Sequence, residues 1–192
     1  MGRNITMNIK KTITILNYLA TKVNSLSKMK VAKLLYYIDK THLLAYGRFV
    51  TGDSYQHQTY GPVPSKTMSI INDPETLDDE NREYLENNIS FENNKHRTIK
   101  SVSEPDLDNF SISDQESIDS VIEKYGHLSA AKLSKISHSE YSWINSAPYE
   151  DIPIADIAHE LPKDQLKELL CFVKDNQETD RFIRAMHGHH FN

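Results

Sequence analysis

Apolar residues recur at helical spacing along much of this chain. A first stripe predicts an amphipathic helix over residues 8–24, and its members are Leu16, Leu19, Ala20 and Val23. A second helix should begin after Ser27, whose hydroxyl suits an N-terminal cap, and end at Gly47, which tolerates the left-handed conformation. Its stripe consists of Val31, Leu34, Leu35, Ile38 and His42.

The pattern changes after the second helix. β-Branched and aromatic residues between positions 48 and 60 predict short extended segments that lead to a turn at Gly61-Pro62. A short helix should follow and end at Asn72-Asp73-Pro74, because the residue before a proline avoids the helical region. Two apolar–polar runs between residues 89 and 102, around Asn93-Asn94, predict a β-hairpin.

Serine caps predict the helices of the second half. The segment Ser113-Asp114-Gln115-Glu116 has the spacing of a capping box, so a helix should run from there to Gly126. Ser129 should cap another short helix through Ser137. Pro162 suits the first position of a last helix, in which we expect Cys171 to be a buried, inert thiol. The apolar face of this last helix consists of Leu166, Leu169, Leu170 and Val173.

These elements predict a mainly α protein, a compact single-domain helical fold with a small β-hairpin or short extended segments. We expect one domain over residues 1–150, with a variable insertion at 73–111. A helical extension at 151–186 should pack on this domain, and residues 187–192 should form a flexible tail.

Charge and cysteine content limit the cellular compartments and the binding partners that suit this protein. The 192 residues carry a net charge of −5, which disfavours a broad nucleic-acid-binding face and favours a basic partner. A single cysteine excludes an internal disulfide or a multi-cysteine zinc site, so a reduced cytoplasm suits the protein. We expect neither a signal peptide nor a membrane span, because long apolar runs are lacking.

Catalytic and metal-binding patterns are weak. His138-Ser139-Glu140 has the H-x-E form of zinc deaminases but lacks their downstream cysteine pair, so a capping and packing role is favoured. The tail histidines His187, His189 and His190 are better explained as a solvated terminus than as a metal site. Phosphate-loop, dinucleotide and nucleophile-elbow signatures are missing. We therefore predict no catalytic residue, no cofactor and no metal.

Carboxylates are concentrated between residues 73 and 86, a segment that contains seven acidic residues and a single basic residue, Arg82. A solvated face is the usual explanation for such a cluster. A docking surface that steers a basic partner is the sharper alternative. Aromatic residues lie close in sequence to Lys33, Lys40 and Arg48. Tyrosine suits both the edge of a core and a protein interface.

Two ordered blocks carry a family resemblance. The first runs from Lys33 to Pro64 and the second from Tyr125 to Trp143. In this order and spacing, over about residues 26–143, the sequence resembles the SocA-like antitoxins with a Panacea domain. Ser142 departs from the pattern, since a proline is expected before the tryptophan. The motif residues, for which a mainly structural role is expected, are Lys33, Leu34, Leu35, Tyr37, Gly47, Gly61, Pro62, Val63, Tyr125, Gly126, Leu133, His138, Glu140 and Trp143.

The resemblance implies a non-enzymatic antitoxin that binds a toxic protein encoded nearby. It also implies a role as an adaptor that delivers the toxin to a AAA+ protease, in a phage-associated or similar setting. The alternative is a DNA-binding autoregulator of its own operon, which acidity disfavours. An enzyme is a more distant alternative. The residues expected at the partner interface are Tyr36, Asp39, His42, Tyr55, Tyr60, Asp78, Asp79 and Glu83.

Overall fold

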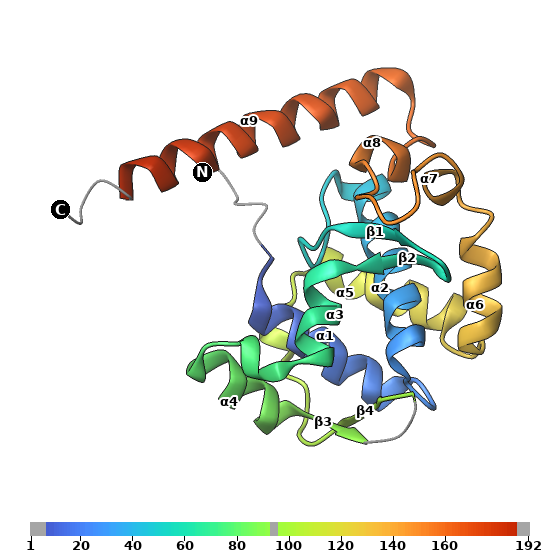
Figure 1. Cartoon of the computed structure of the whole chain (residues 1–192), viewed down its shortest axis with the longest axis vertical. Coiled ribbons are helices and arrows are strands. Elements are labelled where there is room, and N and C mark those ends of the chain that lie inside the picture. Colours follow the sequence, from blue (N-terminus) through green and yellow to red (C-terminus); the bar gives the residue numbers. More distant parts are fainter. Residues whose placement is uncertain (1–6, 93–95, 188–192) are drawn as a thin grey trace.

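The computed structural model describes residues 7–92 and 96–187 and confirms a mainly α, compact fold with two small antiparallel hairpins. Helices surround one central helix, and a last long helix extends past the body (Figure 1). The elements are α1 Ile9–Lys22, α2 Lys28–Tyr46, β1 Tyr55–Gln58, β2 Gly61–Pro64, α3 Ser65–Asn72, η1 Pro74–Thr76, α4 Asp79–Asn88, β3 Ile89–Glu92, β4 Thr98–Ser101, η2 Leu107–Asn109, α5 Ile112–Tyr125, α6 Ala130–Ser137, α7 Tyr141–Ile144, α8 Ile154–Ile157 and α9 Lys163–His187.

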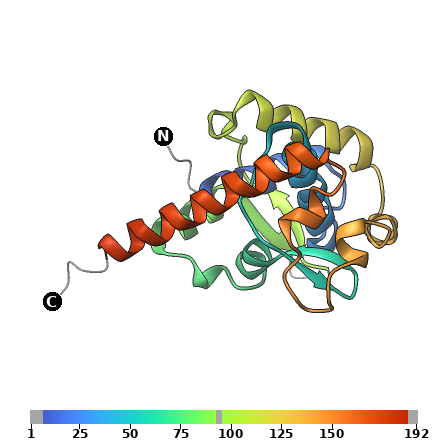
Figure 2. The same cartoon turned by 90° about the horizontal axis from the view of Figure 1, so that it is seen from above.

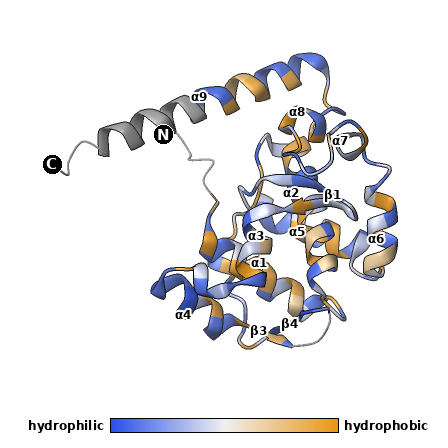
Figure 3. Ribbon diagram, in the orientation of Figure 1, coloured by the Kyte–Doolittle hydropathy of each residue, from blue (hydrophilic) through white to orange (hydrophobic). Residues whose placement is uncertain are grey.

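The central helix is α2, which packs against α5, α6 and β2. Ser27 caps its N-terminus, and Gly47 ends it with φ of 71°, as predicted. It is buried on nearly all sides between Lys30 and Asp39. This part of α2 is therefore a core helix rather than an amphipathic surface helix. Helix α1 covers the β3–β4 hairpin and α4, and the outward face of α4 is largely hydrophilic (Figure 3).

The β1–β2 hairpin corrects one prediction. Gly61 and Pro62 lie within β2, opposite Gln58 and His57, and the turn is formed by Thr59 and Tyr60 instead. Gly61 has φ of +97°, and a Cβ there would stand 2.2 Å from Ser137 Oγ. The glycine therefore serves a close approach between β2 and α6, not a turn.

The β3–β4 hairpin is confirmed, with Ile89 opposite Ser101. Asn93 and Asn94, the predicted centre of its turn, lie outside the described residues. Helix α4, immediately before β3, was not predicted. Its exposed acidic sequence carries little apolar periodicity, and the buried side chains are Leu85 and Asn88.

The capping box of α5 lies two residues earlier than predicted. Ser111 accepts a hydrogen bond from the Asp114 backbone N–H, and the Asp114 carboxylate accepts one from the Ser111 N–H. The predicted partner, Glu116, accepts instead from the Tyr46 hydroxyl at 2.8 Å. The predicted helices ending at Gly126 and beginning after Ser129 are confirmed.

Helix α9 begins just after Pro162 and packs one narrow face on the body. Leu169 is buried, and Leu166 and Val173 are half-buried on the same face. Cys171 is exposed, so the prediction of a buried thiol is wrong. Its place on the side of α9 away from the body explains the difference. Two views show α9 running across the body and ending beyond it (Figures 1 and 2). Of the predicted tail, His187 is the last residue of α9, and residues 188–192 lie outside the described residues.

Candidate functional site

Asp39 organises the loop that follows α2. Its fully buried carboxylate accepts hydrogen bonds from the backbone N–H groups of Val50 and Thr51, at 2.7 and 2.9 Å. It also accepts from the Thr51 hydroxyl and, at 2.7 Å, from the Tyr55 hydroxyl. Burial raises the pKa of Asp39 to about 6, although these hydrogen bonds favour the ionised form. Asp39 therefore fixes the path of residues 50–55.

Asp53 repeats this arrangement at the start of α3. Its carboxylate accepts from the backbone N–H groups of Lys66 and Thr67 and from the Thr67 hydroxyl. These N–H groups belong to the first turn of α3 and lack partners within the helix. Asp53 thus caps α3 from a distant position in the sequence.

Two buried lysines bind backbone carbonyls. Lys33 donates to the Pro62 carbonyl at 2.6 Å, and Lys30 donates to the Gly126 carbonyl at 2.8 Å. Burial lowers the pKa of Lys33 to about 7, and it also lowers the pKa of Lys30. Through these bonds α2 holds both the β1–β2 hairpin and the C-terminus of α5.

Residues of the second block also contact α2. Lys40 forms an ion pair of 2.5 Å with Glu140, and the Tyr36 hydroxyl lies 2.7 Å from Ser142 Oγ. Ser142, at the position where a proline is expected, is thus a buried partner of Tyr36.

Trp143 is stacked between two imidazole rings. Its ring centroid lies 4.5 Å from that of His57 and 4.3 Å from that of His138. Its indole N–H donates to the Gln58 carbonyl at 3.1 Å. The tryptophan therefore joins α6 to the β1–β2 hairpin, and the predicted packing role of His138 agrees with this geometry.

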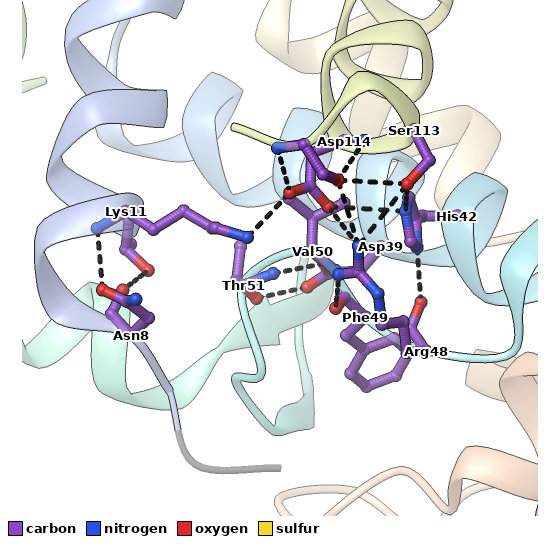
Figure 4. Close-up of polar contacts among 12 residues, drawn as sticks. Asn8, Lys11, Asp39, His42, Arg48, Phe49, Val50, Thr51, Ser113 and Asp114 are labelled. Atoms are coloured by element: carbon purple, nitrogen blue, oxygen red, sulfur yellow. Dashed lines mark hydrogen bonds and ion pairs between the residues drawn. The ribbon is translucent and has the colours of Figure 1, made fainter. Parts of the chain in front are cut away.

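Asp114 is the centre of a second polar cluster, drawn in Figure 4. Its buried carboxylate pairs with Lys11 at 2.7 Å and with Arg48 at 2.9 Å. Burial would raise the pKa of Asp114, but hydrogen bonds from Lys11 and Ser111 lower it to about 2. The cluster joins α1, the loop after α2 and the N-terminus of α5.

His42 lies beside this cluster in the neutral form. Its Nδ1 donates to the Arg48 carbonyl at 2.8 Å, because a carbonyl oxygen only accepts. Its Nε2 faces Ser113 Oγ at 3.2 Å and an Asp114 oxygen at 3.4 Å. Burial lowers the pKa of His42. At neutral pH the cluster of Lys11, Arg48, His42 and Asp114 therefore carries one net positive charge.

Lys11, Arg48 and Asp114 of this cluster, together with Glu116, line a groove of about 1200 Å³ between α9 and the body. The apolar side chains at its walls come from four parts of the sequence. Ile112 is 81% exposed and Phe172 is 48% exposed, although both are large and apolar. The apolar lining is Tyr46, Phe49, Val50, Ile112, Ile154, Phe172 and Val173.

The structure divides the predicted interface residues into two groups. Tyr36, Asp39, His42 and Tyr55 are buried and bonded within the core, so they could touch a partner only if the core opened. The remaining residues are exposed and do not line the groove; they are Tyr60, Asp78, Asp79 and Glu83. Tyr60 stands at the tip of the β1–β2 turn with 60% of its surface exposed.

Much of the predicted acidic surface is paired locally. Arg82 bonds Glu75 at 3.0 Å and Asp79 at 2.5 Å, and Lys10 pairs with Glu80. Asp78 caps α4 through the Asn81 N–H. Such exposed pairs contribute little stability, and they reduce the charge that this face presents to a partner.

The residues at the groove were missed by sequence reasoning. Ile112 and Phe172 are 60 positions apart, and an exposed apolar residue at a helix start gives no signal by itself. The sequence did indicate Asp114 as a possible capping residue, because it is one of two acidic residues that lie three positions after a serine.

Neither a metal-binding group nor a membrane-spanning helix is present among the residues that the structure describes. Within residues 7–92 and 96–187, no His, Cys, Asp and Glu side chains form a group of three suited to a metal ion. No helix in that part has the length and apolar character needed to cross a membrane.

Comparison with known proteins gives one match. The sequence model described as antitoxin SocA-like, Panacea domain, matches residues 31–144, which is more than half of the protein. The matched region runs from within α2 to the end of α7 and contains both motif blocks. No curated protein and no solved structure gives a significant match.

Proposed function

Because the chain belongs to the family of SocA-like antitoxins with a Panacea domain, we propose that it neutralises a cognate protein toxin by direct protein–protein binding. The family match is the observation that carries this proposal. It covers the framework of α2, the β1–β2 hairpin, α5 and α6. Most motif residues build that framework, so the partner would be recognised by side chains displayed around it.

The exposed surface supports a binding role. Large apolar side chains stand exposed at several places on the body, among them Tyr60, Ile112 and Phe172. Tyrosine and phenylalanine are enriched at protein interfaces, where each buries a large apolar area with little loss of side-chain entropy. The net charge of −5 favours encounter with a basic toxin.

We further propose that the bound toxin is handed to a AAA+ protease. The distal half of α9 extends beyond the body in both views (Figures 1 and 2). Purified protease should degrade the toxin faster when the antitoxin is present. Equal degradation with and without the antitoxin would remove the adaptor role and leave neutralisation by binding intact.

The neutralisation itself is tested by growth. Cells should express each immediately neighbouring reading frame with and without this protein, over a series of induction levels. Growth arrest by one frame, relieved only by co-expression of the protein, is the expected result and identifies the partner. If no neighbour arrests growth, or if co-expression gives no relief, the proposed function is wrong.

A further inference from the structure

Three large side chains are exposed where the β1–β2 hairpin meets α7 and the loop that follows it. Ile144 on α7 is 61% exposed, and Tyr149 in the loop is 68% exposed. Tyr60, in the turn of the hairpin, is 60% exposed. Exposed apolar side chains that gather in one region are typical of protein–protein contacts. We call the surface formed by these three residues the hairpin–α7 surface.

Hydrogen bonds hold the three segments of this surface together. The Tyr149 N–H donates to the His57 carbonyl at 2.8 Å, and the His57 N–H donates to the Glu150 carbonyl at 2.9 Å. The Trp143 indole N–H donates to the carbonyl of Gln58, the last residue of β1 before the turn. Figure 1 shows α7 and the following loop beside the hairpin. The exposed side chains are therefore displayed on a fixed frame.

The backbone of Tyr149 is unusual. Its φ is +66°, in the left-handed region, which residues other than glycine, asparagine and aspartate rarely adopt. Burial of the ring does not explain the choice of tyrosine, because most of this side chain is exposed. Strained residues of this kind gather at functional sites, where the displayed group outweighs the loss of stability.

The charge around Tyr149 is of one sign. Residues 136–162 contain five carboxylates and neither lysine nor arginine. Lys40 pairs with two of them, Glu140 and Glu160. The other three form no ion pair within the part of the chain that the structure describes; they are Glu150, Asp151 and Asp156. The first two of these follow Tyr149 directly in the sequence.

This charge selects a basic occupant. When Lys40 and the flanking Lys135 and Lys163 are included, five carboxylates stand against three lysines, a net charge of −2. Lysine or arginine side chains of a partner would meet carboxylates beside an exposed tyrosine ring, whose face attracts cations. Nucleic acid would be repelled, and a second copy of this chain, with a net charge of −5, is disfavoured for the same reason.

We propose that the hairpin–α7 surface, with the carboxylates of Glu150 and Asp151, binds a basic segment of the toxin in which lysine or arginine side chains flank apolar residues. The proposal rests on the proposed function, since it names the contact through which neutralisation occurs. The family match ends at residue 144 and assigns no role to Tyr149 or to the two carboxylates.

Tyr149→Asn separates binding from stability. Asparagine tolerates the left-handed backbone and removes the ring. The variant should bind the purified toxin, identified by the growth test, about tenfold more weakly or worse by titration calorimetry. Its midpoint of thermal unfolding should equal or exceed that of the wild type. A role in folding alone predicts the reverse, a lower midpoint with unchanged affinity, and that result would overturn the proposal.

Val102→Asn is the matched control for loss of an exposed apolar side chain. Val102 is 57% exposed and directly follows β4. Helix α7 and β4 lie at opposite ends of the body (Figure 1). This variant should bind the toxin as the wild type does. Equal weakening by Val102→Asn and Tyr149→Asn would contradict a contact at the hairpin–α7 surface.

Two double variants with the same net charge test the role of the carboxylates. Glu150→Gln combined with Asp151→Asn should weaken toxin binding about tenfold and reduce its dependence on salt. Glu83→Gln combined with Glu86→Gln, at exposed positions of α4, should leave both near the wild-type values. If the two pairs changed affinity equally, net charge rather than this surface would act, and the proposal would be wrong.

The outcomes separate this proposal from the proposed function. If the wild-type protein neither binds nor neutralises the toxin, both are wrong. If it neutralises the toxin, and Tyr149→Asn and the Glu150/Asp151 double variant bind as tightly as the wild type, only the hairpin–α7 contact is wrong. Sedimentation of the wild-type protein alone should show a monomer. Self-association that Tyr149→Asn abolishes would make a second copy the occupant and overturn the assignment to the toxin.

Discussion

Lys33 donates a hydrogen bond of 2.6 Å from its buried ammonium group to the carbonyl oxygen of Pro62. The two residues belong to the central helix and to the β1–β2 hairpin, both within the family region. Pro62 has no N–H to give to a strand partner, but its carbonyl is free to accept. A titratable group therefore holds the hairpin on α2.

This contact predicts a pH dependence of stability. Burial lowers the pKa of Lys33 from 10.5 to about 7, so between these values the unfolded chain binds more protons than the folded one. The free energy of unfolding contributed by this group should rise with pH across that window, by up to about 1.4 kcal/mol per pH unit. It should fall as pH drops toward 7. Urea unfolding at several pH values measures the slope.

Lys33→Met should flatten that slope. Met fills a similar volume without a titrating amine, although the Pro62 carbonyl loses its partner at a cost of about 1–3 kcal/mol. Lys132→Met, at an exposed position on α6, is the control and should keep the wild-type slope. An unchanged slope in Lys33→Met would show that Lys33 titrates alike in both states.

Asp39→Asn should destabilise the protein by about 2–4 kcal/mol, because the asparagine amide would turn N–H donors toward groups that also donate. Four donors now converge on this carboxylate. Tyr55→Phe removes a single one of these bonds and should cost about 1 kcal/mol. The midpoint of urea unfolding measures both. Similar midpoints for the two variants would contradict the central role of Asp39.

Asp114 should contribute stability that is lost in acid. Its pKa is lowered from 3.8 to about 2, so the contribution is fully present above pH 4 and disappears as pH falls through 2. The shift corresponds to about 2 kcal/mol. Asp114→Asn should lower stability at pH 7 and show a weaker further loss between pH 4 and 2. If the wild type and Asp114→Asn lost the same amount of stability between pH 4 and 2, the result would contradict a stabilising role of the ion pairs with Lys11 and Arg48.

Gly61→Ala should be far more harmful than Gly47→Ala. Both glycines have positive φ, so each alanine costs about 1 kcal/mol in backbone strain. At Gly61 the new methyl would also stand 2.2 Å from Ser137 Oγ, whereas at Gly47 the nearest atom is Leu169 Cδ1 at 4.0 Å. Thermal unfolding compares them. Equal losses would mean that α6 can move away from β2 at little cost.

Local signals predicted most of the helices, but not α4. Periodic apolar residues and a serine cap placed α2 because both act over a few neighbouring residues. The capping box of α5 was misplaced because Ser111 and Ser113 each have an acidic residue three positions on. The ion pairs with Lys11 and Arg48 favour Asp114 as the capping residue. Both partners come from distant parts of the sequence, so local spacing did not reveal them.

The candidate site was less accessible to sequence reasoning. Exposed tyrosines and carboxylates were expected at the interface, but Tyr36 and Tyr55 are core residues. Aromatic residues suit both environments, so their type does not decide between them. The groove depends on where α9 crosses the body, and Phe172 lines it together with the start of α5 only in the folded protein.

The central claim is that this protein acts by binding its toxin rather than by chemical turnover. The most direct measurement is titration of the purified toxin's activity with increasing amounts of the purified antitoxin. Neutralisation by binding predicts that activity falls in proportion to the antitoxin added and vanishes near molar equivalence. Complete inactivation by trace amounts of the antitoxin, or full activity in its excess, would contradict the account.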